Sequence, residues 1–397
     1  MKTNEHASLT PPWFATPARA GRYRLTGPWF LALAVLTAGY LGAAPQPVVK
    51  SFPATPGGSL VADIEGGDIV VIAGGHDVQV SVAGLPSELA DDLVIEQTAG
   101  TVRVGFHPSR RARSWSGVRF EFTVPPEFKL DLRTSGGDIR FQGTLTGEIR
   151  AKTAGGDFQF DRLAGHTTLT TSGGDIVGGE VGGDIELRTS GGDIRLTDVG
   201  GNVTAETSGG DITVRSCTGD LEVKTAGGDI HLGSIAGEVT AQTAGGNISV
   251  EHAAKAARLK TAGGNIRVLR ADAGLEATTA GGDLQLGAVA GAFSAKTAGG
   301  DIFLELAAGA QSGTAKTVGG DVSLAVPPDS RLTIGARIQL QGNPAPDDYT
   351  IRCLIPGTSP EISKSPDLIS TEIKLNGGGP MVELETANGN ITIRPVD

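Results

Sequence analysis

The stretch T-S-G-G-D-I at 207–212 decides the fold of this chain, because the same six letters stand at 134–139, 171–176 and 189–194. The threonine that opens the motif occurs eleven times, at a spacing of 18 residues except for 19 at the first step and 20 at the last. A fixed short period of this kind is the signature of a repeat protein. The eleven positions are Thr134, Thr153, Thr171, Thr189, Thr207, Thr225, Thr243, Thr261, Thr279, Thr297 and Thr317.

Each 18-residue unit contains two strand patterns that are separated by glycine turns. In one half Ile212 and Val214 alternate with the polar Thr213 and Arg215, and the other half repeats the alternation at 221–224. Such alternation predicts a strand with one buried side and one solvent-facing side. The glycine pairs at both joints predict tight turns with positive φ angles, which glycine adopts without steric cost.

Two strands per period fit either a solenoid of stacked coils or an antiparallel meander of hairpins. The outward residue before each threonine favours the solenoid, because a base alternates there with another residue type. In a stack this alternation separates like charges by about 9.6 Å, near the screening length of about 8 Å. The residues in question are Arg188, Glu206, Lys224, Gln242, Lys260, Thr278 and Lys296.

We therefore predict an all-β protein, a single-stranded parallel β-solenoid with 18-residue coils, two short strands per coil and irregular caps at both ends. The caps are expected because an open terminal coil exposes a sheet edge. The predicted parts are degenerate N-terminal coils or a cap at 48–133, regular repeats at 134–322, a proline-rich capping insertion at 323–383 and a final repeat strand at 384–397.

The N-terminus has the composition of a targeting segment. A basic region at 1–24 precedes the uncharged apolar run 25–44, which predicts either a signal peptide cut after Ala44 or an uncleaved transmembrane anchor. Both alternatives place the repeat domain outside the cytoplasm, in the periplasm, at the cell surface or anchored to the membrane. Residues 1–44 carry four Lys and Arg and one Glu, so 29 basic and 43 acidic side chains remain, a formal charge of −14.

The chain resembles a bacterial putative-adhesin β-repeat family, a domain family of unknown function related to head-GIN-domain putative adhesins. The resemblance rests on the TSGGDI and TAGGDI units, on VRFEFTVPP at 118–126 and on NGGGPMVELETANGNITI at 376–393, and it covers nearly all of 48–397. It implies an exported β-solenoid and supplies no catalytic residues.

An acidic row is the first candidate site, because one position of eleven successive units is always Asp or Asn. Calcium prefers several oxygen ligands, and calcium β-rolls also use 18-residue coils. However, their nonapeptides read GGxGxD, whereas here the acid directly follows the glycine pair. We expect a structural row that caps backbone N–H groups, with no metal or cofactor, and calcium remains the alternative. Its members are Asp138, Asp157, Asp175, Asp193, Asp211, Asp229, Asn247, Asn265, Asp283, Asp301 and Asp321.

A loop at 107–119 is the second candidate site, since arginines surround Trp115 in an otherwise acidic protein. Basic residues beside an aromatic ring bind phosphate, anionic lipid or polyanionic glycan, although a solvated loop has the same composition. The loop's arginines are Arg110, Arg111, Arg113 and Arg119.

Catalysis is not expected. Sugar-cleaving sites use aromatic platforms with acids, yet Trp115 is the single tryptophan after residue 44, and the coils at 189–302 predict only Thr, Ser, Arg, Lys and Glu on the outside. The histidines lie singly, without ligand-like spacing. The two cysteines, Cys217 and Cys353, lie far apart and make no disulfide framework.

The sequence thus predicts an exported, non-catalytic structural or adhesive module of the cell envelope. Its expected partner is an envelope protein or a surface glycan, with membrane contact only through the N-terminal segment. The acidic charge disfavours nucleic acid. The alternatives are a calcium- or anionic-glycan-binding envelope module and, less favoured, a polysaccharide-active enzyme.

Overall fold

The computed structural model describes residues 47–108, 117–342 and 347–396. The chain divides into two units, Met1–Ala43 and Ala44–Asp397, and all of the described residues lie in the second. The signal or anchor segment predicted at 25–44 lies outside the described residues. Among the residues that are described, no helix is long and apolar enough to span a bilayer.

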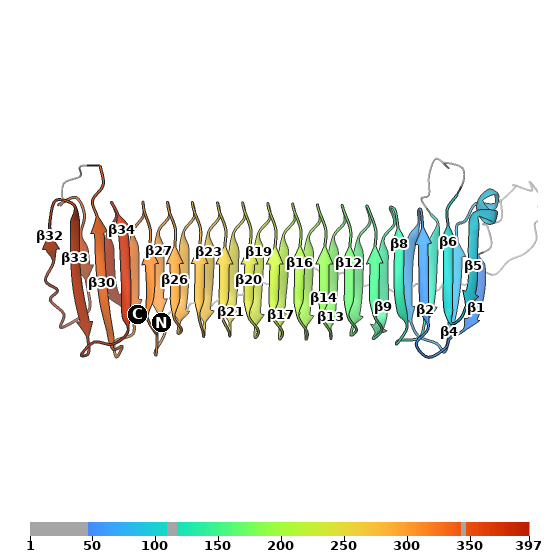
Figure 1. Cartoon of the computed structure of the whole chain (residues 1–397), viewed down its shortest axis with the longest axis horizontal. Coiled ribbons are helices and arrows are strands. Elements are labelled where there is room, and N and C mark those ends of the chain that lie inside the picture. The colour runs from blue at the N-terminus through green and yellow to red at the C-terminus, as the bar shows by residue number, and fades with distance from the viewer. Residues whose placement is uncertain (1–46, 109–116, 343–346, 397) are drawn as a thin grey trace, which may run out of the picture. The chain divides into compact units, whose positions relative to one another are not determined.

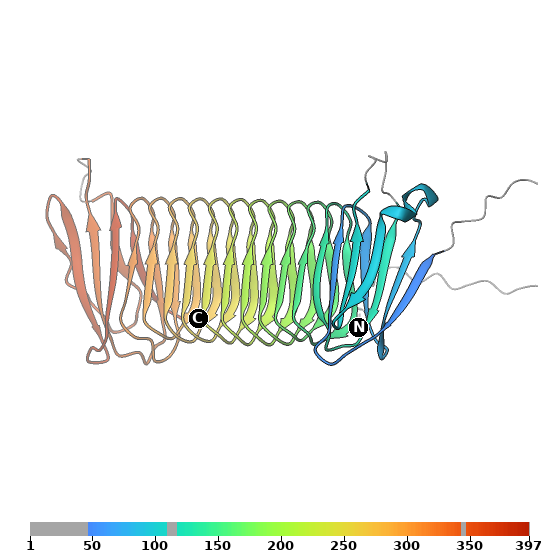
Figure 2. The ribbon, with the colours of Figure 1, turned by 45° about the vertical axis from the view of Figure 1, so that its right-hand side comes forward.

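The second unit is a stack of coils whose strands form two long sheets (Figure 1). Each regular coil gives a short strand, of four residues in every coil after the first, to one sheet, which we call sheet B, and then a strand to the other, sheet A. One coil is formed by β14 (Ile185–Arg188) and β15 (Ile194–Val199). Figure 2 shows how the turns between them stack along the rod.

The regular strands follow in chain order. In sheet A they are β9 (Ile139–Leu145), β11 (Phe158–Leu163), β13 (Ile176–Val181), β15, β17 (Ile212–Cys217), β19 (Ile230–Ile235), β21 (Ile248–Ala253), β23 (Ile266–Ala271), β25 (Leu284–Val289), β27 (Ile302–Leu306) and β29 (Val322–Val326). In sheet B they are β8 (Lys129–Thr134), β10 (Ile149–Lys152), β12 (Thr167–Thr170), β14, β16 (Val203–Glu206), β18 (Leu221–Lys224), β20 (Val239–Gln242), β22 (Ala257–Lys260), β24 (Leu275–Thr278), β26 (Phe293–Lys296) and β28 (Gly313–Lys316).

Neighbouring strands in both sheets are parallel, and equivalent residues lie side by side. In sheet A, Ile194 is aligned with Ile212 and Ile212 with Ile230. In sheet B, Glu206 is aligned with Lys224. The predicted parallel solenoid is therefore confirmed, and the antiparallel meander is wrong for the regular coils.

The core lies between the two sheets and combines large with small side chains. Ile212 and Val214 of sheet A are fully buried, as are Ala205 and Ala241 of sheet B. Cys217 is buried at a position where the next coil has Ile235. Burying these residues is favourable only in a stack, because a single coil covers neither face of its own strands.

The glycine pairs of the regular turns have a different cause from the predicted one. Gly191 and Gly192 do not adopt positive φ angles, so that part of the sequence interpretation is wrong. A Cβ added to Gly192 would lie 2.0 Å from the carbonyl oxygen of Gly174 in the preceding coil. One added to Gly191 would have its nearest neighbour 3.6 Å away. The second glycine is therefore required by the close approach of two backbones.

The N-terminal end contains a coil that is out of chain order. The coil of β2 and β3 lies between the coil of β6 and β7 and that of β8 and β9, with parallel pairing on both sides. Antiparallel strands then cover the end, as β4 pairs with β7, β1 with β4, and β5 with β6. The elements are β1 (Val48–Pro53), β2 (Ser59–Ile64), β3 (Asp68–Ala73), β4 (Asp77–Ala83), η1 (Ser87–Asp92), β5 (Leu93–Thr98), β6 (Thr101–Phe106) and β7 (Arg119–Val124).

The C-terminal end also contains a coil out of chain order and antiparallel strands that cover the end. The last coil of the chain, β34 and β35, inserts between the coil of β28 and β29 and the outer strands β30 and β31. The antiparallel β33 and β32 then cover β30. The strands are β30 (Leu332–Gln339), β31 (Ile351–Cys353), β32 (Ser363–Lys364), β33 (Leu368–Leu375), β34 (Met381–Ala387) and β35 (Ile391–Pro395).

Candidate functional site

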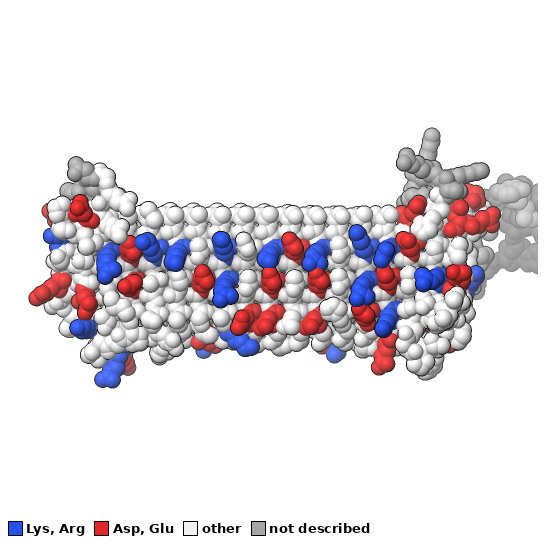
Figure 3. Space-filling view, viewed as in Figure 1, with Lys and Arg blue, Asp and Glu red and all other residues white. Residues whose placement is uncertain are grey.

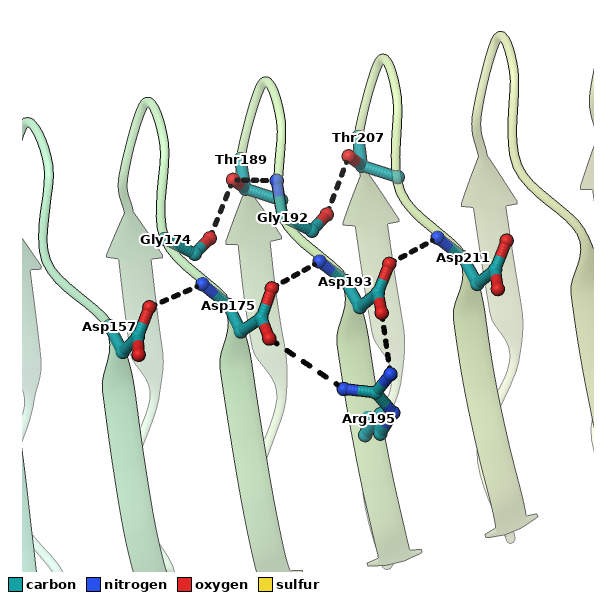
Figure 4. A network of polar contacts seen from close by, with 9 residues as sticks. All are labelled: Asp157, Gly174, Asp175, Thr189, Gly192, Asp193, Arg195, Thr207 and Asp211. Carbon is teal, nitrogen blue, oxygen red and sulfur yellow. Dashed lines mark hydrogen bonds and ion pairs between the residues drawn. The ribbon is translucent and has the colours of Figure 1, made fainter.

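The repeated threonine links each turn to the turn of the preceding coil (Figure 4). The Thr189 hydroxyl donates to the carbonyl oxygen of Gly174 at 2.9 Å and accepts from the backbone N–H of Gly192 at 3.3 Å. All eleven repeat threonines are buried. The same pair of contacts occurs at every repeat threonine from Thr153 to Thr317. Each hydroxyl therefore satisfies backbone groups in two coils.

The acidic row forms a second set of contacts between coils. The Asp175 carboxylate accepts a hydrogen bond from the backbone N–H of Asp193 in the next coil, at 2.8 Å. Asn247 and Asn265 accept in the same way with their amide oxygens, at 2.8 and 2.7 Å. Because the neutral side chains make the same bond, this contact does not depend on charge.

The carboxylate oxygens that remain face outward and are partly neutralised by arginine. Arg195 lies 2.5 Å from Asp193 and 3.8 Å from Asp175, and Arg140 lies 2.9 Å from Asp138. Within the described residues, no group of three or more His, Cys, Asp or Glu is arranged to hold a metal ion. In the acidic row, one side-chain oxygen per coil is therefore used to accept a hydrogen bond from the backbone of the next coil.

The opposite edge of the solenoid has a shorter row that the sequence interpretation missed. Asp184 accepts from the backbone N–H of Asn202, Asn202 from that of Asp220, and Asp220 from that of Glu238, at 2.8 to 2.9 Å. The signal was present in the sequence as an Asp or Asn that precedes the four-residue strand at 18-residue spacing. It ends where Glu238 takes that position.

The predicted arginine loop lies almost entirely outside the described residues, which omit Arg110, Arg111, Arg113 and Trp115. Arg119 is described and begins β7, where its guanidinium lies 3.8 Å from the carboxylate of Glu121. Its neighbourhood is the exposed surface of sheet A.

An apolar groove on the outer face of sheet A is the main feature that the sequence interpretation did not predict. Its volume is about 460 Å³, and Leu269 and Phe303 contribute to its walls. Both side chains are 50% exposed. The expectation that the coils at 189–302 present only Thr, Ser, Arg, Lys and Glu is therefore wrong at Leu269, since strand alternation directs this leucine outward.

Local backbone irregularity shapes this groove. The register between β25 and β27 shifts after Leu286, and Ala288 has a φ of 42°, an uncommon value for a residue with a side chain. Gly287 packs so closely on β23 that an added Cβ would lie 2.8 Å from the carbonyl oxygen of Leu269. The small residues at 287 and 288 leave a hollow beside Leu269, and Arg267 and Glu305 add charge to the lining.

These features define a class: a capped parallel β-solenoid whose turns are joined by side-chain hydrogen bonds. The sequence profile of the Toastrack family, DUF4097, matches residues 59–232 and 198–353, which together are more than half of the chain. The chain belongs to this family. The resemblance to a putative-adhesin β-repeat family is confirmed.

Three solved structures are similar to the chain. A putative adhesin from Bacteroides fragilis NCTC 9343 is 16% identical, with 89% of this chain and 98% of that chain covered and a TM-score of 0.20. A putative adhesin from Parabacteroides distasonis ATCC 8503 is 15% identical, with 70% and 97% covered and a TM-score of 0.31. A putative lipid binding protein from the same organism is 13% identical, with 69% and 97% covered and a TM-score of 0.27. No curated protein matches the chain.

Proposed function

We propose that this protein is an exported, non-catalytic β-solenoid that serves the cell envelope as a structural or adhesive interaction module. The observation that carries the proposal is the exposed apolar groove at Leu269 and Phe303, on an outer surface that is otherwise mostly polar. Exposed apolar patches with polar surroundings mark sites where partners bind. The expected partner is an envelope protein or a surface glycan.

The chemistry of the groove supports binding rather than catalysis. Among the described residues that line it, Glu305 is the one carboxylate, and neither His nor Cys is present. General acid–base catalysis needs a positioned donor and acceptor of suitable pKa. The groove instead combines two large apolar side chains with guanidinium groups, and Phe and Arg are enriched at protein interfaces.

The composition of the N-terminal segment supports export. We expect the full chain with a C-terminal reporter to be found outside the cytoplasm after cell fractionation, and a chain without residues 1–44 to remain inside. A reporter that stays in the cytoplasm with the full chain contradicts the export part of the proposal.

The interaction part is tested with the purified full chain and isolated envelope fragments. We expect Leu269→Ser with Phe303→Ser to reduce sedimentation with the fragments. Val94→Ser is the matched control, because Val94 is 52% exposed on β5, outside the groove. Equal sedimentation of all three proteins contradicts a role for the groove, and absence of sedimentation of the unmodified chain contradicts the interaction module itself.

A further inference from the structure

Basic side chains form a straight row along the outer face of sheet B, and Figure 3 shows that face with its line of Lys and Arg. Each comes from the last residue of a four-residue strand. We call these five residues the basic row: Lys152 in β10, Arg188 in β14, Lys224 in β18, Lys260 in β22 and Lys296 in β26.

The register of sheet B fixes the spacing of this row. From β10 to β26 every second coil contributes one member, and the coils between them contribute Thr170, Glu206, Gln242 and Thr278. The two-coil period ends there, because Arg133 of β8 is aligned with Lys152 and Lys316 of β28 with Lys296. With about 4.8 Å between adjacent strands, successive members lie about 9.6 Å apart, and the row extends for about 38 Å. No register shift interrupts the pairing from β10 to β26.

Most of the positive charge in this row is available to a ligand. Across the described part of the chain, Lys152, Lys260 and Lys296 make no ion pair or hydrogen bond through their side chains. Arg188 and Lys224 pair with Glu186 and Glu222 of their own strands, at the solvent surface, and Arg188 also lies 3.8 Å from Glu206 of the next coil. The chain as a whole has a formal charge of −11, so this regular line of cations is a local feature of one face.

We propose that the basic row binds a linear anionic polysaccharide that carries one acidic group per disaccharide. An extended disaccharide has about the length of two coils, so each acidic group meets one cation while the intervening sugar lies over a coil without one. Thr170, Gln242 and Thr278 offer hydrogen-bonding groups to that sugar. The inference rests on the proposed function, since it names the partner of an extracytoplasmic module.

The spacing argues against the other anionic partners. A nucleic acid strand carries a phosphate about every 3.4 Å, so roughly three phosphates would face each cation. A lipid bilayer has mobile headgroups and gains nothing from a straight row of fixed period. A linear glycan with regularly spaced charges matches both the straight course and the spacing of the basic row. Its many weak contacts then add along one chain.

The test measures binding of the purified full chain to hyaluronate, which carries one carboxylate per disaccharide, at low salt. The row variant is Lys152→Gln, Lys260→Gln and Lys296→Gln. The control variant removes the same charge elsewhere, with Lys129→Gln, Lys255→Gln and Lys374→Gln. We expect the row variant to lose about tenfold in affinity, since three exposed ion pairs disappear, and the control less than about twofold.

Three outcomes overturn the inference: no binding of hyaluronate by the unmodified chain, equal losses in both variants, or tighter row-dependent binding of single-stranded DNA or phosphatidylglycerol vesicles. Circular dichroism melts of both variants must match the unmodified chain. The proposed function fails separately, when the chain is not exported or does not bind envelope fragments. If export and envelope binding hold while hyaluronate binding does not depend on the row, only this inference fails.

Discussion

The two glycines of one turn should respond in opposite ways to alanine. A Cβ at Gly210 would lie 2.0 Å from the carbonyl oxygen of Gly192 and 2.4 Å from its carbon, whereas at Gly209 the nearest atom would be 3.5 Å away. Relief of the first contact requires the two turns to separate by at least about 1 Å. The second substitution fits the existing space.

The expected loss of stability follows from the strain of overpacking and from the hydrogen bonds that break when the two turns separate. Overpacking of a well-packed site costs about 1–3 kcal/mol. The Thr207 hydroxyl would leave the carbonyl of Gly192, and the N–H of Asp211 would leave the Asp193 carboxylate, two bonds worth about 0.5–1.5 kcal/mol each. Gly210→Ala should therefore destabilise the protein by about 2–6 kcal/mol. Gly209→Ala should change stability by less than about 1 kcal/mol, in the stabilising direction.

Guanidinium unfolding of the full chain gives the global effect, and hydrogen exchange gives the local one. Because each coil contacts only its neighbours, the damage from Gly210→Ala should be concentrated in 203–224 and leave the protection of 279–296 unchanged. Equal unfolding midpoints for the two variants would refute the argument that close backbone approach requires the second glycine.

Three further predictions concern side chains. Thr225→Val should destabilise by about 2–4 kcal/mol, because it leaves the Gly210 carbonyl and the Gly228 N–H unpaired, whereas Thr225→Ser should cost about 1 kcal/mol in the same denaturation assay. Millimolar calcium should leave the thermal melt unchanged from EDTA; a rise of many degrees that is abolished by Asp193→Asn, Asp211→Asn and Asp229→Asn would instead identify the acidic row as a metal site. Hydrogen bonds from His252 and Arg270 lower the pKa of Asp272 below its usual 3.8, so its stabilising contribution is present above about pH 4 and disappears as the pH falls through the folded value. Asp272→Asn should therefore lower stability at pH 7, and its difference from the unmodified chain should shrink as the pH falls below 3.8, so a difference that stays constant from pH 7 into that range would contradict the assignment.

The sequence was sufficient to predict the coil, because every level of its pattern agrees there. The 18-residue period and the strand alternation predict two strands per unit, the alternating charge before each threonine favours parallel stacking, and the registers at Ile212 and Lys224 confirm it. The order of the end coils was not predictable. A strand pattern shows which residues form a strand and which of them are buried, but it does not show which coil lies next to which. After β33 the chain passes back between β28 and β30, where β34 pairs with both strands, and no local sequence signal specifies this path.

The groove also escaped prediction, for a different physical reason. Leu269 and Phe303 occupy outward positions 34 residues apart, and only stacking brings them to one hollow. The irregular backbone at Ala288 deepens that hollow, and a positive φ at alanine has no sequence signature. The arginine loop, in contrast, was visible in the sequence, but it remains a prediction because four of its five named residues lie outside the described part of the chain.

The division between inward and outward positions indicates where function should be sought in this protein. At the turns, the repeat threonines, the second glycines and the Asp or Asn row are fixed by contacts with the preceding or following coil, and replacement of Asp by Asn at 247 and 265 keeps those contacts. The outward positions have no such partner to satisfy, so stacking alone permits any polar residue there. The apolar groove on sheet A departs from that expectation and therefore needs an explanation beyond stability, and binding of a partner supplies one. The two-coil period of cations on sheet B also keeps like charges about 9.6 Å apart in the stack, so this period serves stability as well as the proposed ligand.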